Sequence, residues 1–172
     1  MKKWRFVLAI LAAATIASPA LTFAGDAFFK GGLTFHPDVG GVGERWFISL
    51  GSDWSFHPMG FIGVEFQSAY HSSSALGIAS VKTVPVNLLL NGKWKSQGEA
   101  VRPYAGVGVG LVSSYVRTEF LGVTDDSYVK DAGFQLMGGV ELNRKWLVEL
   151  LGQRVLEDGA EFSWSILGGI RW

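Results

Sequence analysis

The sequence lacks cysteine, and that absence excludes two covalent devices. The chain has no disulfide framework and no residue that could carry a lipid after a signal peptide. Long apolar runs are scarce as well. Beyond residue 24, no stretch approaches the roughly 20 apolar residues that a membrane helix needs. A basic stripe is also missing, which excludes nucleic acid as a partner.

Residues 1–24 stand apart from the rest of the chain. A positive head with three basic residues is followed by an uncharged, almost wholly apolar run, and then by small residues before Ala20 and Ala24. This order is typical of a secretory signal peptide and is too short for a membrane helix with a stop signal. We predict cleavage after Ala24, with cleavage after Ala20 as one alternative and a retained membrane anchor as another.

The remaining chain, residues 25–172, is long enough for one domain. Removing the signal takes away three of the 15 basic residues and none of the 15 acidic ones, which leaves a net charge of −3. Hydrophobic residues make up 48% of the sequence and aromatic residues 13%, with 23 glycines. An exported, cysteine-free chain with this composition and no membrane helix indicates a β-barrel of the outer membrane of a Gram-negative bacterium.

The stretch 162–172 shows the underlying pattern most clearly. Every second residue from Phe162 to Trp172 is apolar or glycine, and the residues between them are mainly small or polar, with one cation, Arg171. A period of two predicts a β-strand. Aromatic residues on both sides of an aliphatic middle are typical of a strand that crosses a bilayer.

The same alternation recurs along the chain and predicts eight strands. We place them at 27–36, 46–57, 62–71, 81–95, 102–115, 134–142, 146–153 and 162–172. Short connections follow the even strands and longer ones the odd strands, the longest being a charged loop over roughly 117–130. The prediction is an all-β, eight-stranded antiparallel up-and-down transmembrane barrel with both termini in the periplasm. Pro85 falls inside one strand, where it requires a bulge or a local break in pairing.

The phase of the alternation sorts the side chains into an outer and an inner set. Aromatic residues expected in the outer girdles are Trp46, Trp54, Phe56, Trp94, Phe162, Trp164 and Trp172. Charged residues expected in the lumen are Lys30, Asp53, Glu65, Lys93, Glu141, Glu149 and Arg171. Because charge inside a narrow barrel has to be paired, we predict an ionic network that plugs the lumen, with a selective ion path as the alternative.

In these features the chain resembles the small eight-stranded outer-membrane barrels: the transmembrane domain of outer membrane protein A, the OmpX/Ail group and the opacity-like proteins. The resemblance rests on the terminal aromatic Trp172, with alternating apolar residues before it, and on the segment RPYAGVGVG at 102–110. The usual last residue in that family is Phe, so Trp is a departure. The resemblance implies that the outer-membrane assembly machinery reads the terminal strand. It indicates location better than activity, because the family's roles vary.

The function expected from these features is that of a structural or surface-interaction barrel with no enzymatic activity, cofactor or metal. Arg117, Lys130 and Arg154 lie near the expected outer rim, where they are candidates for charge-assisted contacts with lipopolysaccharide phosphates. The three histidines fall at different ends of the strands and lack metal-ligand spacing. The oligomeric state stays open.

Two other functions are compatible with an exported barrel. The first is a lipid A-modifying enzyme, because His71-Ser72-Ser73 invites comparison with the lipid A deacylases, which use a His-x-Ser pair and a carboxylate. Their pair belongs to a late strand, whereas no acidic residue follows His71 before Glu99 here. The second is a soluble periplasmic lipocalin-like binder, whose apolar residues would point inward. The alternation of apolar and polar residues alone does not show whether the apolar residues point outward, as in a membrane barrel, or inward, as in a soluble one.

Overall fold

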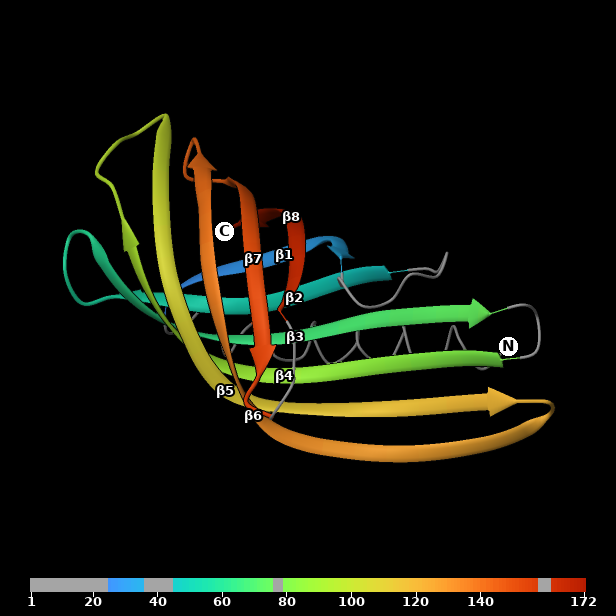
Figure 1. Cartoon of the computed structure of the whole chain (residues 1–172). Helices are drawn as coiled ribbons and strands as arrows, with labels where there is room; N and C mark the ends of the chain where they lie inside the picture. The colour runs from blue at the N-terminus through green and yellow to red at the C-terminus, as the bar shows by residue number, and fades with distance from the viewer. Residues whose placement is uncertain (1–24, 36–44, 76–78, 158–161) are drawn as a thin grey trace.

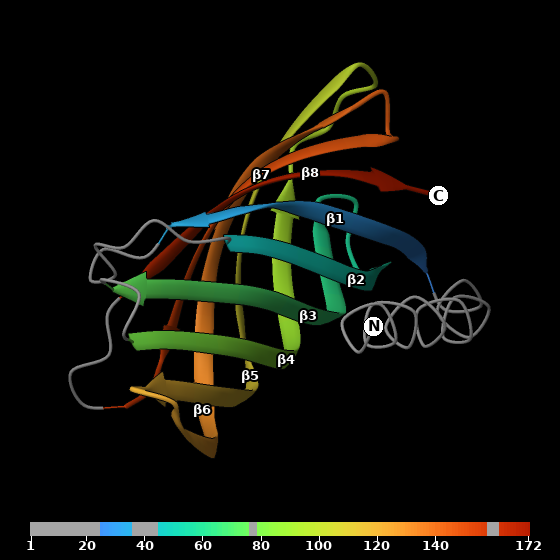
Figure 2. The same ribbon diagram turned by 90° about the vertical axis from the view of Figure 1, so that its right-hand side faces the viewer.

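The computed structural model describes residues 25–35, 45–75, 79–157 and 162–172, so the predicted signal peptide lies outside the described residues. The elements are β1 (Asp26–Phe35), β2 (Arg45–Ser55), β3 (Gly60–Ala75), β4 (Ala79–Lys95), β5 (Val101–Phe120), β6 (Val123–Leu142), β7 (Trp146–Val155) and β8 (Ser163–Arg171). Each strand pairs antiparallel with the next, and β1 pairs with β8 to close the barrel (Figures 1 and 2). The predicted eight-stranded antiparallel barrel is confirmed. Among the described residues, no helix is long and apolar enough to cross a membrane.

The strands on one side of the barrel are longer than the sequence pattern predicts. β3 and β4 have 16 and 17 residues, and β5 and β6 have 20 each. β4 pairs with β5 up to Ala79↔Phe120, whereas the β6–β7 ladder ends at Gly133↔Val155, so the β5–β6 hairpin projects well past β7 but not past β4 (Figure 1). The predicted loop over 117–130 is therefore wrong. The hairpin continues through it and closes at Leu121 and Gly122, whose φ angles of 49° and 82° suit a two-residue turn. Outside a bilayer neither face of a hairpin has to be apolar. The alternation of apolar and polar residues therefore ends before the pairing of the two strands does.

Pro85 interrupts one ladder without shifting its register. The β3–β4 ladder stops after Ser68↔Val86 and resumes at His71↔Thr83 in the same register. The two positions between these pairs carry no ladder pair, because proline has no N–H to donate. The sequence allowed either a bulge or a local break in pairing at Pro85, and the barrel contains the local break.

The two faces of the barrel differ sharply in polarity. The exposed outer face carries a broad apolar band that includes Leu33, Leu88, Leu90, Val107, Val109, Leu111, Leu136, Val148, Leu150 and Ile166. The inner face holds the buried charges, and Lys30, Glu65 and Glu149 are each at most 1% exposed. This is the arrangement of a membrane barrel and the reverse of a soluble one. It contradicts the lipocalin-like alternative.

Inward-facing glycines make room for the long polar side chains of the lumen. A Cβ at Gly108 would collide with Oδ1 of Asn91, and a Cβ at Gly139 would lie 2.9 Å from the Tyr104 hydroxyl oxygen. The sequence pattern predicts that the glycine run 106–110 accommodates Tyr104. The space comes instead from Gly139, which is the ladder partner of Tyr104 on the neighbouring strand.

Candidate functional site

Buried side chains form successive layers along the axis of the lumen. We call the end where β1 begins and β8 ends the terminal end, and the end that carries the β5–β6 turn the distal end. An ionic cluster around Asp53 occupies the terminal end, and a second cluster around Lys30 follows it. Amide side chains come next, and a cavity lies at the distal end.

The terminal cluster is organised around one carboxylate. Asp53 lies 2.9 Å from Nζ of Lys93, 3.1 Å from Nζ of Lys95 and 2.6 Å from Nη2 of Arg171. The side chain of Asp53 is fully buried, so these contacts take the place of water around its charge. The ring of Phe28 lies 4.2 Å from Nζ of Lys93 and adds a cation–π contact.

Glu141 completes the terminal cluster from the opposite side. Its carboxylate lies 3.6 Å from Nζ of Lys95, 3.1 Å from Nη1 of Arg102 and 3.3 Å from Nε of Arg171. Arg171 also reaches Asp26 at the mouth, at 3.1 Å. Each arginine or lysine of the cluster therefore contacts at least one carboxylate, Lys95 contacts two and Arg171 contacts three.

The middle cluster holds one lysine between two acids. Nζ of Lys30 lies 2.8 Å from Glu65 and 2.6 Å from Glu149. The Tyr104 hydroxyl donates to Glu149 at 2.8 Å, and the Ser49 hydroxyl donates to Glu65. All these groups are buried, and a network satisfied in this way is rigid and specific.

All seven charged residues predicted for the lumen face it, and they divide between the two clusters. Sequence reasoning missed Lys95 and Arg102, which contribute two of the five bases in the described ion-pair network. Both occupy inward positions by simple counting along β4 and β5. They lie at strand ends, where strand boundaries are hardest to place from sequence and where we assigned no phase.

The seven predicted girdle residues divide between the two rims. Trp46, Phe162 and Trp164 lie toward the distal end, and Trp54, Phe56, Trp94 and Trp172 toward the terminal end. Several are stacked on neighbours, with ring centroids 5.8 Å apart for Trp46–Tyr70 and for Phe162–Trp164. The sequence pattern places His57 inside the lumen. This prediction is wrong: His57 is exposed in the β2–β3 turn and stacks on Trp94 at 5.4 Å.

The three cations predicted for the outer rim are not gathered at one point. Arg117 pairs with Asp126 at 3.7 Å on the projecting hairpin, and each side chain is about half exposed. Lys130 lies further along β6, and Arg154 lies on β7 opposite Phe134. The sequence reasoning did not include Lys82, which faces Arg117 directly across the β4–β5 ladder.

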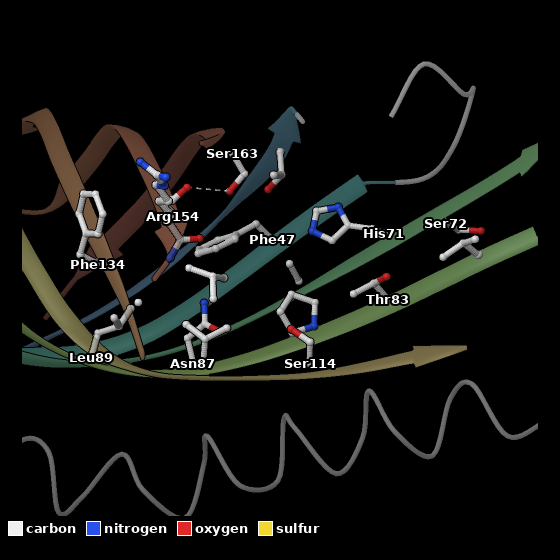
Figure 3. Close-up of a pocket in the computed structure, with 18 of the residues that line it drawn as sticks. Phe47, His71, Ser72, Thr83, Asn87, Leu89, Ser114, Phe134, Arg154 and Ser163 are labelled. Atoms are coloured by element: carbon white, nitrogen blue, oxygen red, sulfur yellow. Dashed lines mark hydrogen bonds between the residues drawn. The ribbon is translucent and has the colours of Figure 1, made fainter. Parts of the chain in front are cut away.

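A cavity of about 270 Å³ lies at the distal end of the lumen (Figure 3). Its lining is mostly apolar, with Phe47, Leu89, Val112, Phe134 and Val155 among the wall residues. The polar lining residues include His71, Ser73, Thr83, Asn87, Ser114 and Gln153, together with the cation Arg154. Within the described part of the lining there is no acidic residue.

At the distal end, the described residues do not complete a catalytic or metal-binding site around the histidine and hydroxyl side chains. His71 and Ser73 both line the cavity, as a His-x-Ser pair on one strand does. A Ser–His pair needs a carboxylate to orient the histidine, and none of the described cavity-lining residues supplies one. Over the described ranges, no three His, Cys, Asp or Glu side chains are grouped to hold a metal ion, and His36 lies outside those ranges.

Comparisons with known proteins bear on the fold. No protein-family model matches the sequence, and no curated protein sequence matches it. The crystal structure of Ail, the attachment invasion locus protein of Yersinia pestis, matches with a TM-score of 0.58 and 10% identity, over 87% of this chain and 99% of Ail. Ail in complex with the heparin analogue sucrose octasulfate matches with a TM-score of 0.54 and 11% identity, over 87% and 99% of the two chains. Neisserial surface protein A matches with a TM-score of 0.54 and 14% identity, over 85% and 93%. The chain has the fold of the small eight-stranded outer-membrane β-barrels.

Proposed function

We propose that this protein is a non-enzymatic barrel of the bacterial outer membrane, exported by a signal peptide at 1–24, with a structural or surface-interaction role. The observation that carries the proposal is the sidedness of the barrel. Apolar side chains cover its exposed outer face, while the charges are paired inside it. An outer face of this kind is stable against acyl chains and unstable against water.

Membrane placement has a direct test in the behaviour of the native protein. Outer-membrane barrels keep their fold in detergent unless they are heated, so the protein extracted from an outer-membrane fraction should migrate differently on a gel before and after boiling. The expected result is a heat-dependent shift of a band that cofractionates with outer membranes. Recovery from the periplasmic fraction, with no such shift, would contradict the proposal.

The lumen of the proposed barrel is closed rather than conducting. Eight strands leave an interior just wide enough for side chains to fill it. Two ionic clusters, an amide layer and apolar residues such as Phe47, Met137 and Leu151 occupy that space. Reconstitution in planar bilayers should give no large stable conductance. Steady steps of several nanosiemens would support the selective ion path instead.

Lipopolysaccharide is the proposed partner of the outer rim. Arg117, Lys130 and Arg154 lie in the distal parts of β5, β6 and β7, and Arg154 also borders the distal cavity. At this end of the barrel such cations would pair with lipid phosphates. The double variant Arg117→Ala plus Lys130→Ala should reduce the lipopolysaccharide that co-purifies with the barrel. The matched control removes Arg144 and Lys145, which lie in the β6–β7 turn at the terminal end, and should leave the lipid content unchanged. Equal lipid content in both double variants would remove lipopolysaccharide pairing from the proposal.

The C-terminal strand is the proposed contact for the outer-membrane assembly machinery. β8 closes the barrel against β1, and Trp172 ends it on an aromatic residue at the terminal rim. No geometric observation favours the lipid A-modifying alternative, since the described lining around His71 contains no carboxylate. Release of fatty acid from lipopolysaccharide incubated with the purified barrel would nevertheless establish it.

A further inference from the structure

The floor of the distal cavity is a layer of amide side chains whose orientation is set by Glu65. The Glu65 carboxylate only accepts hydrogen bonds, and Nε2 of Gln67 donates to it at 3.0 Å. Gln67 therefore turns its carbonyl oxygen away from Glu65, and that oxygen accepts from Nδ2 of Asn87 at 3.3 Å and from Nε2 of Gln153. The amide groups thus point in one direction, from the cavity toward the carboxylate.

This direction leaves acceptor oxygens at the cavity end of the layer. Asn87 is 6% exposed, and its Oδ1 has no hydrogen-bond partner among the described residues. Gln153 uses Nε2 to donate both to Gln67 and, at 3.2 Å, to Gln135, so its two amide hydrogens are engaged and its carbonyl oxygen remains. Both residues line the cavity, and Figure 3 labels Asn87 there. Buried acceptors normally have a donor, and here a molecule in the cavity can supply it.

The walls restrict what that molecule can be. Phe47, Leu89 and Val112 give the cavity a largely apolar surface, and the hydroxyls of Thr83 and Ser114 add groups that both donate and accept. None of the described lining residues is acidic, so nothing in this part of the wall offsets a positive charge. The cation in the lining, Arg154, is exposed, so its own charge does not need a charged ligand as a partner. A volume of about 270 Å³ is just below the ~300–1,000 Å³ typical of sites for drug-sized ligands, which suits a single ring.

We propose that the distal cavity binds a small neutral ring that carries adjacent hydroxyl groups. Two neighbouring hydroxyls donate to Asn87 Oδ1 and Gln153 Oε1, and the C–H face of the ring packs against the apolar wall. This chemistry is that of a monosaccharide or a cyclic polyol. The ring is supplied either by a free sugar or by a sugar residue of an outer-leaflet glycolipid. The binding site is separate from the rim cations Arg117 and Lys130, whereas Arg154 borders it.

The test is an NMR titration of the folded barrel in detergent, read at the side-chain amide resonances of Asn87 and Gln153. The probes are a cyclohexanediol with adjacent hydroxyls, its dimethyl ether, methyl glucoside, and the delipidated core oligosaccharide of lipopolysaccharide. The expected result is a saturable shift with the diol and none with the ether, which keeps the ring but has no donors. Binding of methyl glucoside identifies a free sugar as the source, and binding of the core oligosaccharide alone identifies the glycolipid.

Variants connect the signal to the cavity. Ser114→Phe fills the cavity and should abolish the shift, whereas Ser113→Phe, at the neighbouring outward position, should leave it unchanged. Asn87→Leu removes one acceptor at similar volume and should weaken the apparent affinity roughly threefold to tenfold, as the loss of one hydrogen bond does. Heat-dependent gel migration verifies that each variant is folded. A cavity that holds water only, with no saturable shift for any probe, would overturn the proposal, as would equal binding of the ether or binding that persists in folded Ser114→Phe.

Discussion

Replacing Asp53 by asparagine should remove the central charge of the terminal cluster while keeping its shape. Asp53 contacts Lys93, Lys95 and Arg171 at 2.9, 3.1 and 2.6 Å, and its side chain is 0% exposed. The new amide would bring N–H donors toward three cations that are themselves donors. Glu141 still reaches Lys95 and Arg171, at 3.6 and 3.3 Å, so these two keep a partner.

The magnitude follows from the loss of a buried ion pair. Removing one partner of such a pair costs about 3–5 kcal/mol, because the other charge is left buried and uncompensated. Lys93 is in that position after Asp53→Asn, because Asp53 is its only ion-pair partner among the described residues. We therefore expect the free energy of unfolding to fall by about 3–5 kcal/mol. Adding Lys93→Met should recover part of the loss, since it removes the unpaired cation.

The assay is reversible urea unfolding in lipid vesicles, followed by tryptophan fluorescence. The matched control is Asp126→Asn, which breaks the Arg117–Asp126 pair at 3.7 Å on the projecting hairpin. The Asp126 side chain is 49% exposed, so this change should alter the free energy of unfolding by only about 0–1 kcal/mol. Equal losses for the two variants, or a loss below about 1 kcal/mol for Asp53→Asn, would refute the reasoning that paired charges hold the lumen together.

Two further substitutions test the packing of the lumen and the position of the bilayer. Gly139→Ala would place a Cβ 2.9 Å from the Tyr104 hydroxyl oxygen and in collision with the backbone carbonyl oxygen of Val148. It should destabilise the barrel by about 1–3 kcal/mol in urea unfolding. Gly92→Ala, whose Cβ would have no atom within 4 Å, should change the stability little. A barrel equally stable with either alanine would contradict the described packing. Val109→Arg puts a charge in the middle of the apolar band and should lower the free energy of unfolding in vesicles by about 2–4 kcal/mol. Glu119→Arg lies near the tip of the hairpin, and its free energy of unfolding should stay within about 0.5 kcal/mol of that of the parent. Similar losses for the two arginine variants would place the bilayer elsewhere.

The sequence was most informative where the bilayer imposes a pattern. Strands such as 162–172 have one face against lipid and one against the lumen, so period-two alternation predicted both the strand and the direction of its side chains. The pattern was least informative beyond the bilayer. There the hairpin around Leu121 and Gly122 mixes exposed apolar residues, such as Phe120 and Val123, with charged ones, so the segment 117–130 lacks a regular alternation and was predicted to be a loop. His57 was misplaced for a related reason, because the strand phase does not continue into a turn.

Local alternation was thus enough to establish the barrel, its sidedness and the identity of most lumen charges, since each of these depends on neighbours along a single strand. The pairing of those charges was decided only when the strands closed into a tube. Lys30 of β1 meets Glu149 of β7 across the lumen, and Asp53 of β2 contacts three cations from two other strands, β4 and β8. The acceptor oxygens of the distal cavity have the same origin. Glu65 orients Gln67 on the same strand, β3, and Gln67 in turn accepts from Asn87 of β4 and Gln153 of β7, through contacts that no single stretch of sequence contains.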